Sequence, residues 1–422
     1  KGVFSINAIV FLGTKKSGSS REAIKAAAAM GYVTCLLTSN SRQFSQRNEY
    51  PDVGMMIYCN LYDYDRIREM ISYLEQLPLT ISAIVSFIDP WCSVAARLSE
   101  VRGLPAFSAE AMRLMENKLK TREALKNTLH NPRFVSIPAT AGGQIHTAKK
   151  LLPAVVKYID SNGSRDVFYS PDRDSLYRNF RILTNLYPEG TILVEEFLEG
   201  PQYIVEVLAI DGDINIVAVV AQEIKLINNH FIIIGYSLLV EPEPNFLCRL
   251  MLAVKTVLGK FGFKNGPCHL EMRNVKGTWK LIEINPRISG AGMNAMIEIG
   301  LGINLARETL KLAVGEKPDL EPKQKIPTYA EYITVAEAGI LHKVIGRREI
   351  EKDPNVKYVY VKPRRGRLIT PPESLGDRYA YVIATGSTSD EAMKNARQAA
   401  EKISFIYEPL DPSINNLIHS QT

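Results

Sequence analysis

Three oxygen-bearing side chains at regular spacing are the strongest chemical signal in this 422-residue sequence. Glu283 and Asn285 lie two positions apart in a stretch that alternates polar and apolar residues, so in a strand they would share one face. Glu271 lies in an earlier stretch of the same kind, and a turn at residues 274–277 would bring it beside them. Such oxygen ligands on adjoining strands suit Mg²⁺. A hairpin with a polar, solvated face explains the spacing equally well.

Positively charged side chains flank this pattern along the chain. Arg287 follows the second predicted strand and enters a loop of small residues, 289–292, which would let a substrate approach the backbone. Lys157 ends an apolar strand and precedes a small polar loop, 161–165, whose backbone N–H groups could cradle phosphates. Lys118 lies on a predicted helix. Taken singly, each lysine is also explained as a solvated cation.

Two further features have both a functional and a structural interpretation. Residues 194–200 form a predicted strand that stops at a turn, where exposed backbone could pair with the edge of an adenine ring. The two acids there, Glu195 and Glu196, could equally lie on the surface. His269 shares a strand face with Glu271, so it either touches substrate or has a structural role.

The elements that must position these residues begin with a parallel sheet. An apolar strand at 8–12, an Ala-rich helix at 20–30 and strands at 33–37 and 81–87 predict an α/β domain to about residue 107. The loop after the first strand imitates a phosphate-binding loop, but Ser19 stands where the required lysine would be. No G-x-G-x-x-G follows that strand either. Both a P-loop NTPase and a nicotinamide-binding domain are therefore disfavoured.

The rest of the chain is predicted to be rich in strands. A helix at 109–125 leads into this region, a polar stretch at 315–325 with two prolines resembles a linker, and Ser389 could cap a last helix at 390–403. The expected strands are 154–158, 191–197, 203–210, 214–222, 231–239, 269–273, 278–284 and 380–384, with a helix at 246–261 before the hairpin.

Composition excludes several classes of protein. With 46% hydrophobic and 23% charged residues, the chain is neither disordered nor collagen-like. The net charge of +6 is too small to indicate nucleic-acid binding, and the basic and aromatic residues of 357–367 fit a strand with one solvated face. Five cysteines without a C-x-x-C pair suggest reduced thiols in a cytoplasmic protein. We expect neither a membrane span nor a secretory signal.

Taken in order, these features resemble the ATP-grasp carboxylate-amine ligases, and among them most of all the bacterial L-amino acid ligases, which make dipeptides. The resemblance covers nearly the whole chain. It implies an ATP-grasp fold of the α/β class, with an α+β body. It also implies an N-terminal parallel α/β domain at 1–107, an ATP-grasp body at 108–315 with a lid at about 135–200, and a C-terminal antiparallel-sheet domain at 316–422.

The resemblance also implies a role for each candidate residue. The family pattern is not matched everywhere, because Tyr158 replaces a common Pro and Asp166 a common Gly. Gln202 replaces a Glu expected on ribose, although an amide can still hydrogen-bond ribose. The implied ATP-binding residues are Lys118, Lys157, Ser164, Glu195, Glu196, Phe197, Leu198 and Gln202; the metal ligands Glu271, Glu283 and Asn285; the catalytic residue Arg287; and the substrate contacts His269, Arg287, Ser289 and Gly290.

The implied activity is ATP-dependent ligation through an acyl phosphate, with release of ADP and phosphate. The implied cofactors are ATP and Mg²⁺, as two ions and replaceable by Mn²⁺. The expected partners are small amino-acid substrates, with no nucleic acid and no membrane; a homodimer is left open. The alternatives are an ATP-grasp enzyme of purine biosynthesis, a biotin carboxylase, or a synapsin-like ATP-binding module without turnover. The full set of Glu271, Glu283, Asn285 and Arg287 disfavours the last alternative.

Overall fold

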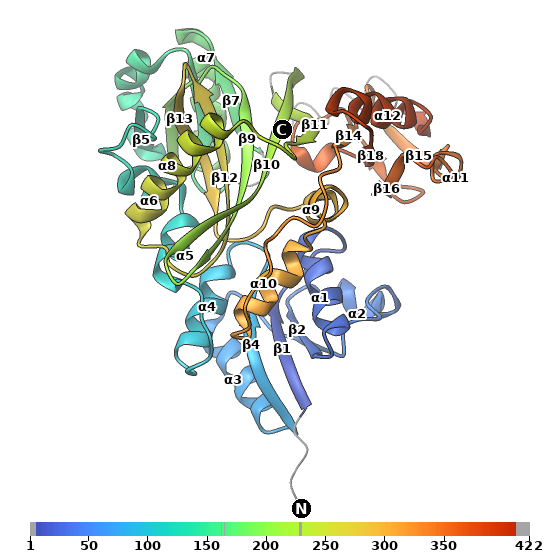
Figure 1. Ribbon diagram of the computed structural model, residues 1–422. Coiled ribbons are helices and arrows are strands. Elements are labelled where there is room, and N and C mark those ends of the chain that lie inside the picture. Colours follow the sequence, from blue (N-terminus) through green and yellow to red (C-terminus); the bar gives the residue numbers. More distant parts are fainter. Residues whose placement is uncertain (1–5, 162, 164, 228–229, 411–422) are drawn as a thin grey trace, which may run out of the picture.

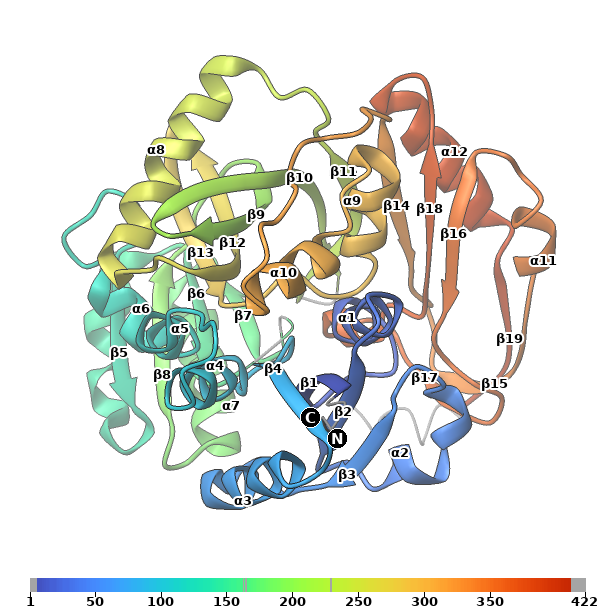
Figure 2. The same cartoon turned by 60° about the horizontal axis from the view of Figure 1, so that its bottom comes forward.

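The computed structural model describes residues 6–161, 163, 165–227 and 230–410. The chain begins with a four-stranded parallel sheet in the order β3-β2-β1-β4 (Figure 2). Residues 8–12 of β1 are almost fully buried, as expected for a parallel strand covered on both faces. The short strand β3 and the helix α3 were not expected from the sequence. The elements are β1 (Ile6–Leu12), α1 (Ser19–Ala29), β2 (Val33–Thr38), α2 (Arg42–Ser45), η1 (Arg47–Glu49), β3 (Met55–Tyr58), α3 (Tyr64–Glu75), β4 (Leu79–Val85) and α4 (Cys92–Glu100).

The single helix expected at 109–125 is wrong, because the chain forms two helices there. These are α5 (Ala109–Met115) and α6 (Lys118–Ala124). Asn117 separates them with an extended backbone, and its side chain accepts a hydrogen bond from the Lys120 N–H at 2.9 Å, as an N-cap residue does. The break makes Lys118 the first residue of α6.

A second sheet, antiparallel and in the order β5-β8-β6-β7, forms the small subdomain that spans the expected lid. Helix α7 begins at a capping box between Asp172 and Ser175 and packs on this sheet around its own apolar cluster. The elements are β5 (Phe134–Pro138), η2 (Ala139–Leu151), β6 (Ala154–Tyr158), β7 (Val167–Ser170), α7 (Arg173–Leu186) and β8 (Thr191–Glu196).

An eight-stranded sheet in the order β13-β12-β9-β10-β11-β14-β18-β16 forms the centre of the molecule. Helices α9 and α10 lie between this sheet and α1 of the first domain, as both views show (Figures 1 and 2). Helix α8 packs on strands β9, β12 and β13. The elements are β9 (Gln202–Ile210), β10 (Asp213–Ile227), β11 (His230–Leu238), α8 (Pro244–Phe261), β12 (Gly266–Val275), β13 (Thr278–Asn285), α9 (Met293–Leu301) and α10 (Leu305–Ala313).

The C-terminal strands continue this central sheet, because β14 pairs with β11 and then with β18. A separate three-stranded sheet, β17-β15-β19, lies beside them. The predicted cap of the last helix was wrong by one residue: the Thr388 side chain, not Ser389, accepts from the Glu391 N–H. The elements are β14 (Thr328–Ile333), β15 (Gly339–Ile345), α11 (Arg347–Ile350), β16 (Val356–Val361), β17 (Leu368–Ile369), η3 (Leu375–Asp377), β18 (Ala380–Thr385), α12 (Ser389–Glu401) and β19 (Ser404–Pro409).

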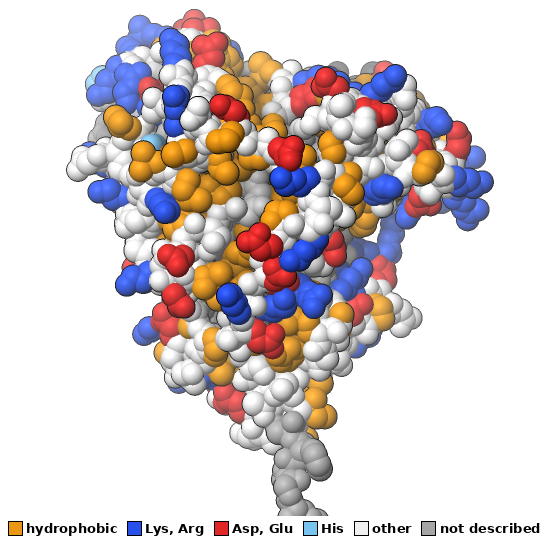
Figure 3. Space-filling model, viewed as in Figure 1, with side chains coloured by type: hydrophobic (Ala, Val, Ile, Leu, Met, Phe, Trp, Pro, Cys, Tyr) orange, Lys and Arg blue, Asp and Glu red, His pale blue; other side chains and the backbone are white. Residues whose placement is uncertain are grey.

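The expected α/β class, with a parallel first sheet and antiparallel sheets after it, is confirmed. Basic and acidic side chains are interspersed over the face shown in Figure 3. Within the part of the chain that is described, no helix is both long and apolar enough to cross a membrane.

Candidate active site

The hairpin expected from the sequence is present, and its register brings the candidate metal ligands together. Glu271 on β12 lies directly opposite Glu283 on β13, and His269 lies opposite Asn285. On the other side of β12, Glu206 of β9 lies opposite His269. Directly paired residues of antiparallel strands share a face. One face of three neighbouring strands therefore carries a compact group of polar side chains.

The carboxylates of Glu271 and Glu283 repel each other, and a bound cation would relieve this repulsion. Burial and, after it, the adjacent Glu283 carboxylate raise the pKa of Glu271 to about 7. Burial also opposes the ionisation of Glu283, but Lys118 and Lys157 hold its pKa below the usual value. The Lys118 Nζ lies 3.8 Å from Glu283 Oε1. Two facing carboxylates in a buried site repel each other unless a positive charge lies close to them.

Asn285 completes a donor set that fits a hard cation. Its Nδ2 donates to His269 Nε2 at 3.2 Å, which leaves the amide oxygen free to act as a ligand. Burial and the charge of Arg287 lower the pKa of His269 to about 4, so the ring is neutral. Its Nδ1–H then donates to the Arg287 carbonyl oxygen at 2.9 Å. Two carboxylates and an amide oxygen are ligands that Mg²⁺ accepts, so the residues present fit this ion.

His269 uses both ring nitrogens inside the protein. This arrangement favours the structural alternative, in which His269 orients Asn285 and the backbone at Arg287. A direct contact between His269 and substrate stays a prediction.

Arg287 is held by a carboxylate from the first domain. Asp89, in the loop after β4, receives hydrogen bonds from Arg287 Nε at 2.7 Å and pairs with its Nη2 at 2.5 Å. Burial alone would raise the pKa of Asp89, but the Arg287 guanidinium holds it below the usual value. Loops at the carboxyl ends of parallel strands commonly form ligand sites in α/β proteins. The pair therefore joins the first domain to the predicted catalytic residue.

Lys157 and Glu195 form a buried ionic cluster with Arg122, a residue of α6 that the sequence did not single out. Arg122 donates from Nε and Nη2 to the two Glu195 oxygens at 2.5 and 3.2 Å, and Lys157 Nζ donates to Oε2 at 2.9 Å. Burial opposes charge on Glu195, yet the two cations lower its pKa to about 2. The Glu195 carboxylate is thus turned into the protein, and its backbone lies between strands β5 and β6, so a contact of Glu195 with adenine stays a prediction.

We expect the buried ion pair of Arg122 to stabilise the protein far more than the surface ion pair of Arg113 does. Arg122→Met should lower the free energy of unfolding by about 3–5 kcal/mol, because Glu195 keeps only one partner in a buried site. Urea unfolding measures this loss. The matched control is Arg113→Met, since Arg113 pairs with Glu110 at the surface of the neighbouring helix α5; its unfolding midpoint should stay unchanged. Equal small shifts in both variants would contradict the stabilising role of the cluster.

The other predicted ATP contacts also have protein partners. Glu196 accepts from Arg133 Nε at 2.6 Å and from Lys280 Nζ at 2.9 Å. Phe197 stacks on Phe231 with ring centroids 5.7 Å apart. The Leu198 carbonyl oxygen accepts a hydrogen bond from Arg273. These contacts set the conformation of the segment that links the lid to the central sheet.

Gln202 bridges two charged side chains of β12. It donates to Glu271 Oε2 at 3.1 Å and accepts from Arg273 Nη2 at 2.5 Å. Ser289 donates from its hydroxyl and its N–H to Glu206, whose pKa burial raises to about 7. Gly290 is exposed in the same loop, whereas Ser164 lies outside the described residues.

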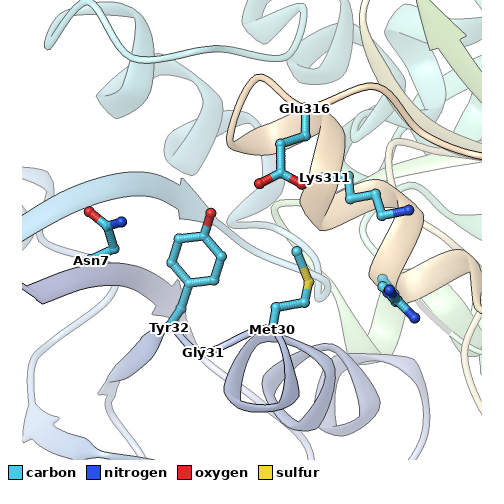
Figure 4. A pocket seen from close by; sticks show the side chains of 7 residues that line it. Asn7, Met30, Gly31, Tyr32, Lys311 and Glu316 are labelled. Atoms are coloured by element: carbon cyan, nitrogen blue, oxygen red, sulfur yellow. The ribbon is translucent and has the colours of Figure 1, made fainter.

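A cavity of about 310 Å³ borders Lys118, Glu283 and Asn285. Asp89, from the loop after β4, and Asp160, from the small subdomain with the sheet β5-β8-β6-β7, also line it. A second cavity, of about 320 Å³, lies between the first domain and α10 and contains none of the predicted site residues (Figure 4). There Tyr32 and Glu316 point toward one another (Figure 4). The first cavity is therefore the candidate active site.

Asp89, Cys92 and Glu116 lie close enough together to suggest a second metal site beside this cavity. Most of their donor atoms have protein partners: Asp89 Oδ2 holds Arg287, and Glu116 accepts from the Ser93 hydroxyl at 2.5 Å, whereas Asp89 Oδ1 is buried without a partner among the described residues. Burial raises the pKa of the Cys92 thiol, which keeps it protonated. We assign no metal to this group.

The sequence analysis missed Asp89, Arg122 and Glu206. A signal existed for two of them. Asp89 follows the last strand of a parallel sheet, and Glu206 is a lone acid in the apolar strand β9. Arg122 lies four residues after Lys118 on α6, but nothing in that spacing points to Glu195.

Comparisons with known proteins match two parts of the chain to families. Residues 152–295 match the model of the ATP-grasp domain, and residues 331–408 match that of the L-amino acid ligase C-terminal domain 2. An uncharacterized protein of Sinorhizobium fredii is 26% identical over 339 residues, which cover 78% of this chain and 69% of the relative. An L-arginine-specific L-amino acid ligase of Bacillus subtilis is 25% identical over 227 residues, which cover 53% of this chain and 55% of the relative.

Solved structures share the fold at low identity. An L-amino acid ligase from Bacillus licheniformis superposes with a TM-score of 0.79 at 21% identity, over 96% of this chain and 99% of that one. A phosphoribosylglycinamide synthetase from Anaerococcus prevotii gives 0.72 at 18%, over 95% and 100%. The biotin carboxylase domain of a Hydrogenobacter thermophilus 2-oxoglutarate carboxylase, solved with MgADP and bicarbonate, gives 0.69 at 17%, over 94% and 90%.

Residues 152–295 thus carry an ATP-grasp domain, and the chain shares the fold of ATP-grasp ligases. Residues 331–408 carry the C-terminal domain 2 of the L-amino acid ligases, and the chain is similar to proteins of that group.

Proposed function

We propose that this chain is an ADP-forming L-amino acid ligase that joins two amino acids into a dipeptide. The observation that carries the proposal is the facing pair Glu271 and Glu283, with Asn285 beside them, in reach of the cavity that Lys118 also lines. The match of residues 331–408 to an L-amino acid ligase domain supports amino acids as the substrates.

The reaction requires charge to be neutralised around the phosphates of ATP. In the first step a carboxylate oxygen of one amino acid attacks the γ-phosphorus, and the bond from that phosphorus to the β-phosphate oxygen breaks, releasing ADP. In the second step the amine of another amino acid attacks the acyl carbon, the carbon–oxygen bond to phosphate breaks, and the amine loses a proton. Such reactions are catalysed mainly by positioning and electrostatics, so no protein nucleophile is needed.

Each predicted residue has a defined task in this scheme. Lys118 and Lys157 bind ATP phosphates, and Arg287, oriented by Asp89, stabilises the transferring phosphoryl group. Glu271, Glu283 and Asn285 would hold Mg²⁺, which, when bound, supplies positive charge at the phosphate oxygens. The MgADP in the biotin carboxylase domain supports this pairing of nucleotide and ion. Two ions, replacement by Mn²⁺, a homodimer and a cytoplasmic location stay predictions.

The expected division into 1–107, 108–315 with a lid at about 135–200, and 316–422 is also part of the proposal. Separate apolar clusters under the first sheet and within the lid support the first two parts. The third part shares its sheet with the second, since β14 pairs with β11. Residues from both parts can therefore face one active site.

Incubation with ATP, Mg²⁺ and pools of L-amino acids tests the activity. We expect ADP and phosphate only when a suitable pair of amino acids is present, together with a product whose mass is that of the pair minus water. AMP and pyrophosphate would indicate adenylation instead. If bicarbonate or a phosphoribosyl amine stimulates ADP release and no amino acid does, the carboxylase or purine alternative is correct.

A further inference from the structure

Arg378, in the segment matched to the L-amino acid ligase domain, is held rigidly in place. Its guanidinium lies 4.1 Å above the centre of the Tyr332 ring. Nη1 donates to the Ile233 carbonyl at 3.0 Å and to the Tyr236 hydroxyl at 3.2 Å, and Nε donates to the Leu375 carbonyl at 3.2 Å. An arginine stacked on an aromatic ring and bonded to three acceptors is pre-organised.

The turn that carries Arg378 is itself well ordered. The Asp377 carboxylate accepts from the Ser374 N–H and hydroxyl, both at 2.9 Å, in a capping box. The Leu375 N–H donates to the Gly163 carbonyl of the lid at 3.1 Å. Arg378 therefore lies in a turn that contacts the lid.

Arg378 faces the same side of the central sheet as the candidate metal ligands. Directly paired residues run across the sheet on this face: Tyr236 of β11, Gln222 of β10, Gln202 of β9 and Arg273 of β12. Arg273 is two residues from Glu271, so their side chains share that face. Tyr236 also pairs with Ala330, so Tyr332, two residues further on, lies on that face as well. Only the continuation of the body sheet into the C-terminal strands brings these residues to one surface.

The electrostatics agree with this placement. Burial would lower the pKa of Arg378, but the tyrosines beneath it and Glu271 keep the pKa above its usual value. Nη2 donates to no acceptor among the described residues. It is also absent from the fully buried atoms that lack a partner, so it is not sealed inside the protein. The guanidinium thus keeps one nitrogen available for an anion.

The proposed reaction needs such a group. The carboxylate of the first amino acid is consumed, because it becomes the acyl phosphate and then the amide. The second amino acid keeps its carboxylate, and an anion enclosed in the cleft requires a cationic partner. Lys157 and Arg287 already pair with Glu195 and Asp89, and Lys118 lies beside Glu283. Arg378 has no carboxylate partner among the described ion pairs.

We propose that Arg378 binds the α-carboxylate of the amino acid that supplies the amine. The proposal rests on the proposed ligase activity and adds to it a residue that selects the second substrate. The Nη2 group of Arg378 can donate a charge-assisted hydrogen bond to a carboxylate oxygen, and such bonds are stronger than neutral ones. A second substrate without a carboxylate should therefore bind poorly to the wild-type protein.

The test compares two acceptors and one trapping reaction. Dipeptide formation is measured with an acceptor amino acid and with its α-carboxamide, and formation of the acyl phosphate is measured separately by trapping with hydroxylamine. For the wild type, we expect kcat/KM to fall about 10- to 100-fold from carboxylate to carboxamide. With the carboxylate acceptor, Arg378→Met should have a kcat/KM about 10- to 100-fold below that of the wild type. Changing to the carboxamide should lower kcat/KM of the variant little further, because the two changes remove the same interaction. Hydroxamate formation should stay within about twofold of wild type.

Two further variants separate binding from folding. Arg378→Lys keeps the charge and should recover part of the preference for the carboxylate. Arg348→Met removes an exposed arginine on α11 and should match the wild type in every assay. The proposal fails if Arg378→Met loses hydroxamate and dipeptide formation equally, or if it still prefers the carboxylate as strongly as the wild type. If the wild type forms no hydroxamate with any amino acid, the ligase proposal itself fails, and this inference with it.

Discussion

Arg287→Met is expected to lower kcat by about 10³-fold or more while changing the KM for ATP little, because an arginine on a transferring phosphoryl group acts mainly in the transition state. Steady-state ADP release under saturating amino acids measures both constants. A rise in KM with kcat unchanged would show that Arg287 only binds ATP. Single-turnover measurements then separate phosphoryl transfer from product release.

The ion pair with Asp89 provides the control for this experiment. Arg287→Met alone leaves a buried carboxylate without its partner, which can destabilise the protein independently of chemistry. The double variant Arg287→Met/Asp89→Asn removes that charge and should unfold closer to the wild type, with activity as low as in the single variant. Asp89→Asn alone should lower kcat less, since it loosens Arg287 without removing it. Full activity of the double variant would exclude Arg287 from catalysis.

Glu283→Gln is expected to lower turnover by about 10²–10³-fold, the usual effect of losing one group that stabilises the transition-state charge. The amide has nearly the same volume, so the protein should fold, but a neutral oxygen binds Mg²⁺ more weakly than a carboxylate. The activity of the variant should therefore require more Mg²⁺ than the wild type. Calorimetric titration with ADP at several Mg²⁺ concentrations measures the same effect without turnover.

Glu241→Gln is the matched control, because Glu241 is an exposed acid that pairs with Lys325 at the surface. It should behave as the wild type at every Mg²⁺ concentration. If Glu283→Gln keeps wild-type activity at low Mg²⁺, the hairpin is not the metal site, and its polar face is merely structural.

The sequence alone determined the hairpin and three of the four strands of the first sheet, β1, β2 and β4. The alternation of polar and apolar residues around Glu271 and Glu283 has the period of a strand, and the structure pairs these two residues directly. Residues 8–12 form an unbroken apolar run, as a doubly covered parallel strand requires, and they are buried in β1. These features depend on residues only a few positions apart, so they can be read from sequence.

The prediction of one helix at 109–125 was wrong because a side-chain hydrogen bond of Asn117 competes with the helical backbone hydrogen bonds. The apolar pattern of 109–125 continues through Asn117, yet that side chain caps a new helix and ends the previous one. An Asn side chain can replace a helical hydrogen bond with one of its own, and this choice depends on packing around it. The break decides the position of Lys118, at the start of α6 and beside Glu283.

Only the tertiary structure decided how the site is held. Asp89 and Arg287 are 198 positions apart, Arg122 and Glu195 are 73 apart, and no spacing rule connects either pair. The pairing of β14 with β11, which brings Arg378 to the face of Glu271, likewise joins segments that are distant in sequence. Burial makes unpaired charges costly, so each partner is chosen by which charges the packed chain brings together. The sequence indicates which side chains are suited to the proposed chemistry, and the packing of the sheets decides which charged groups pair with one another.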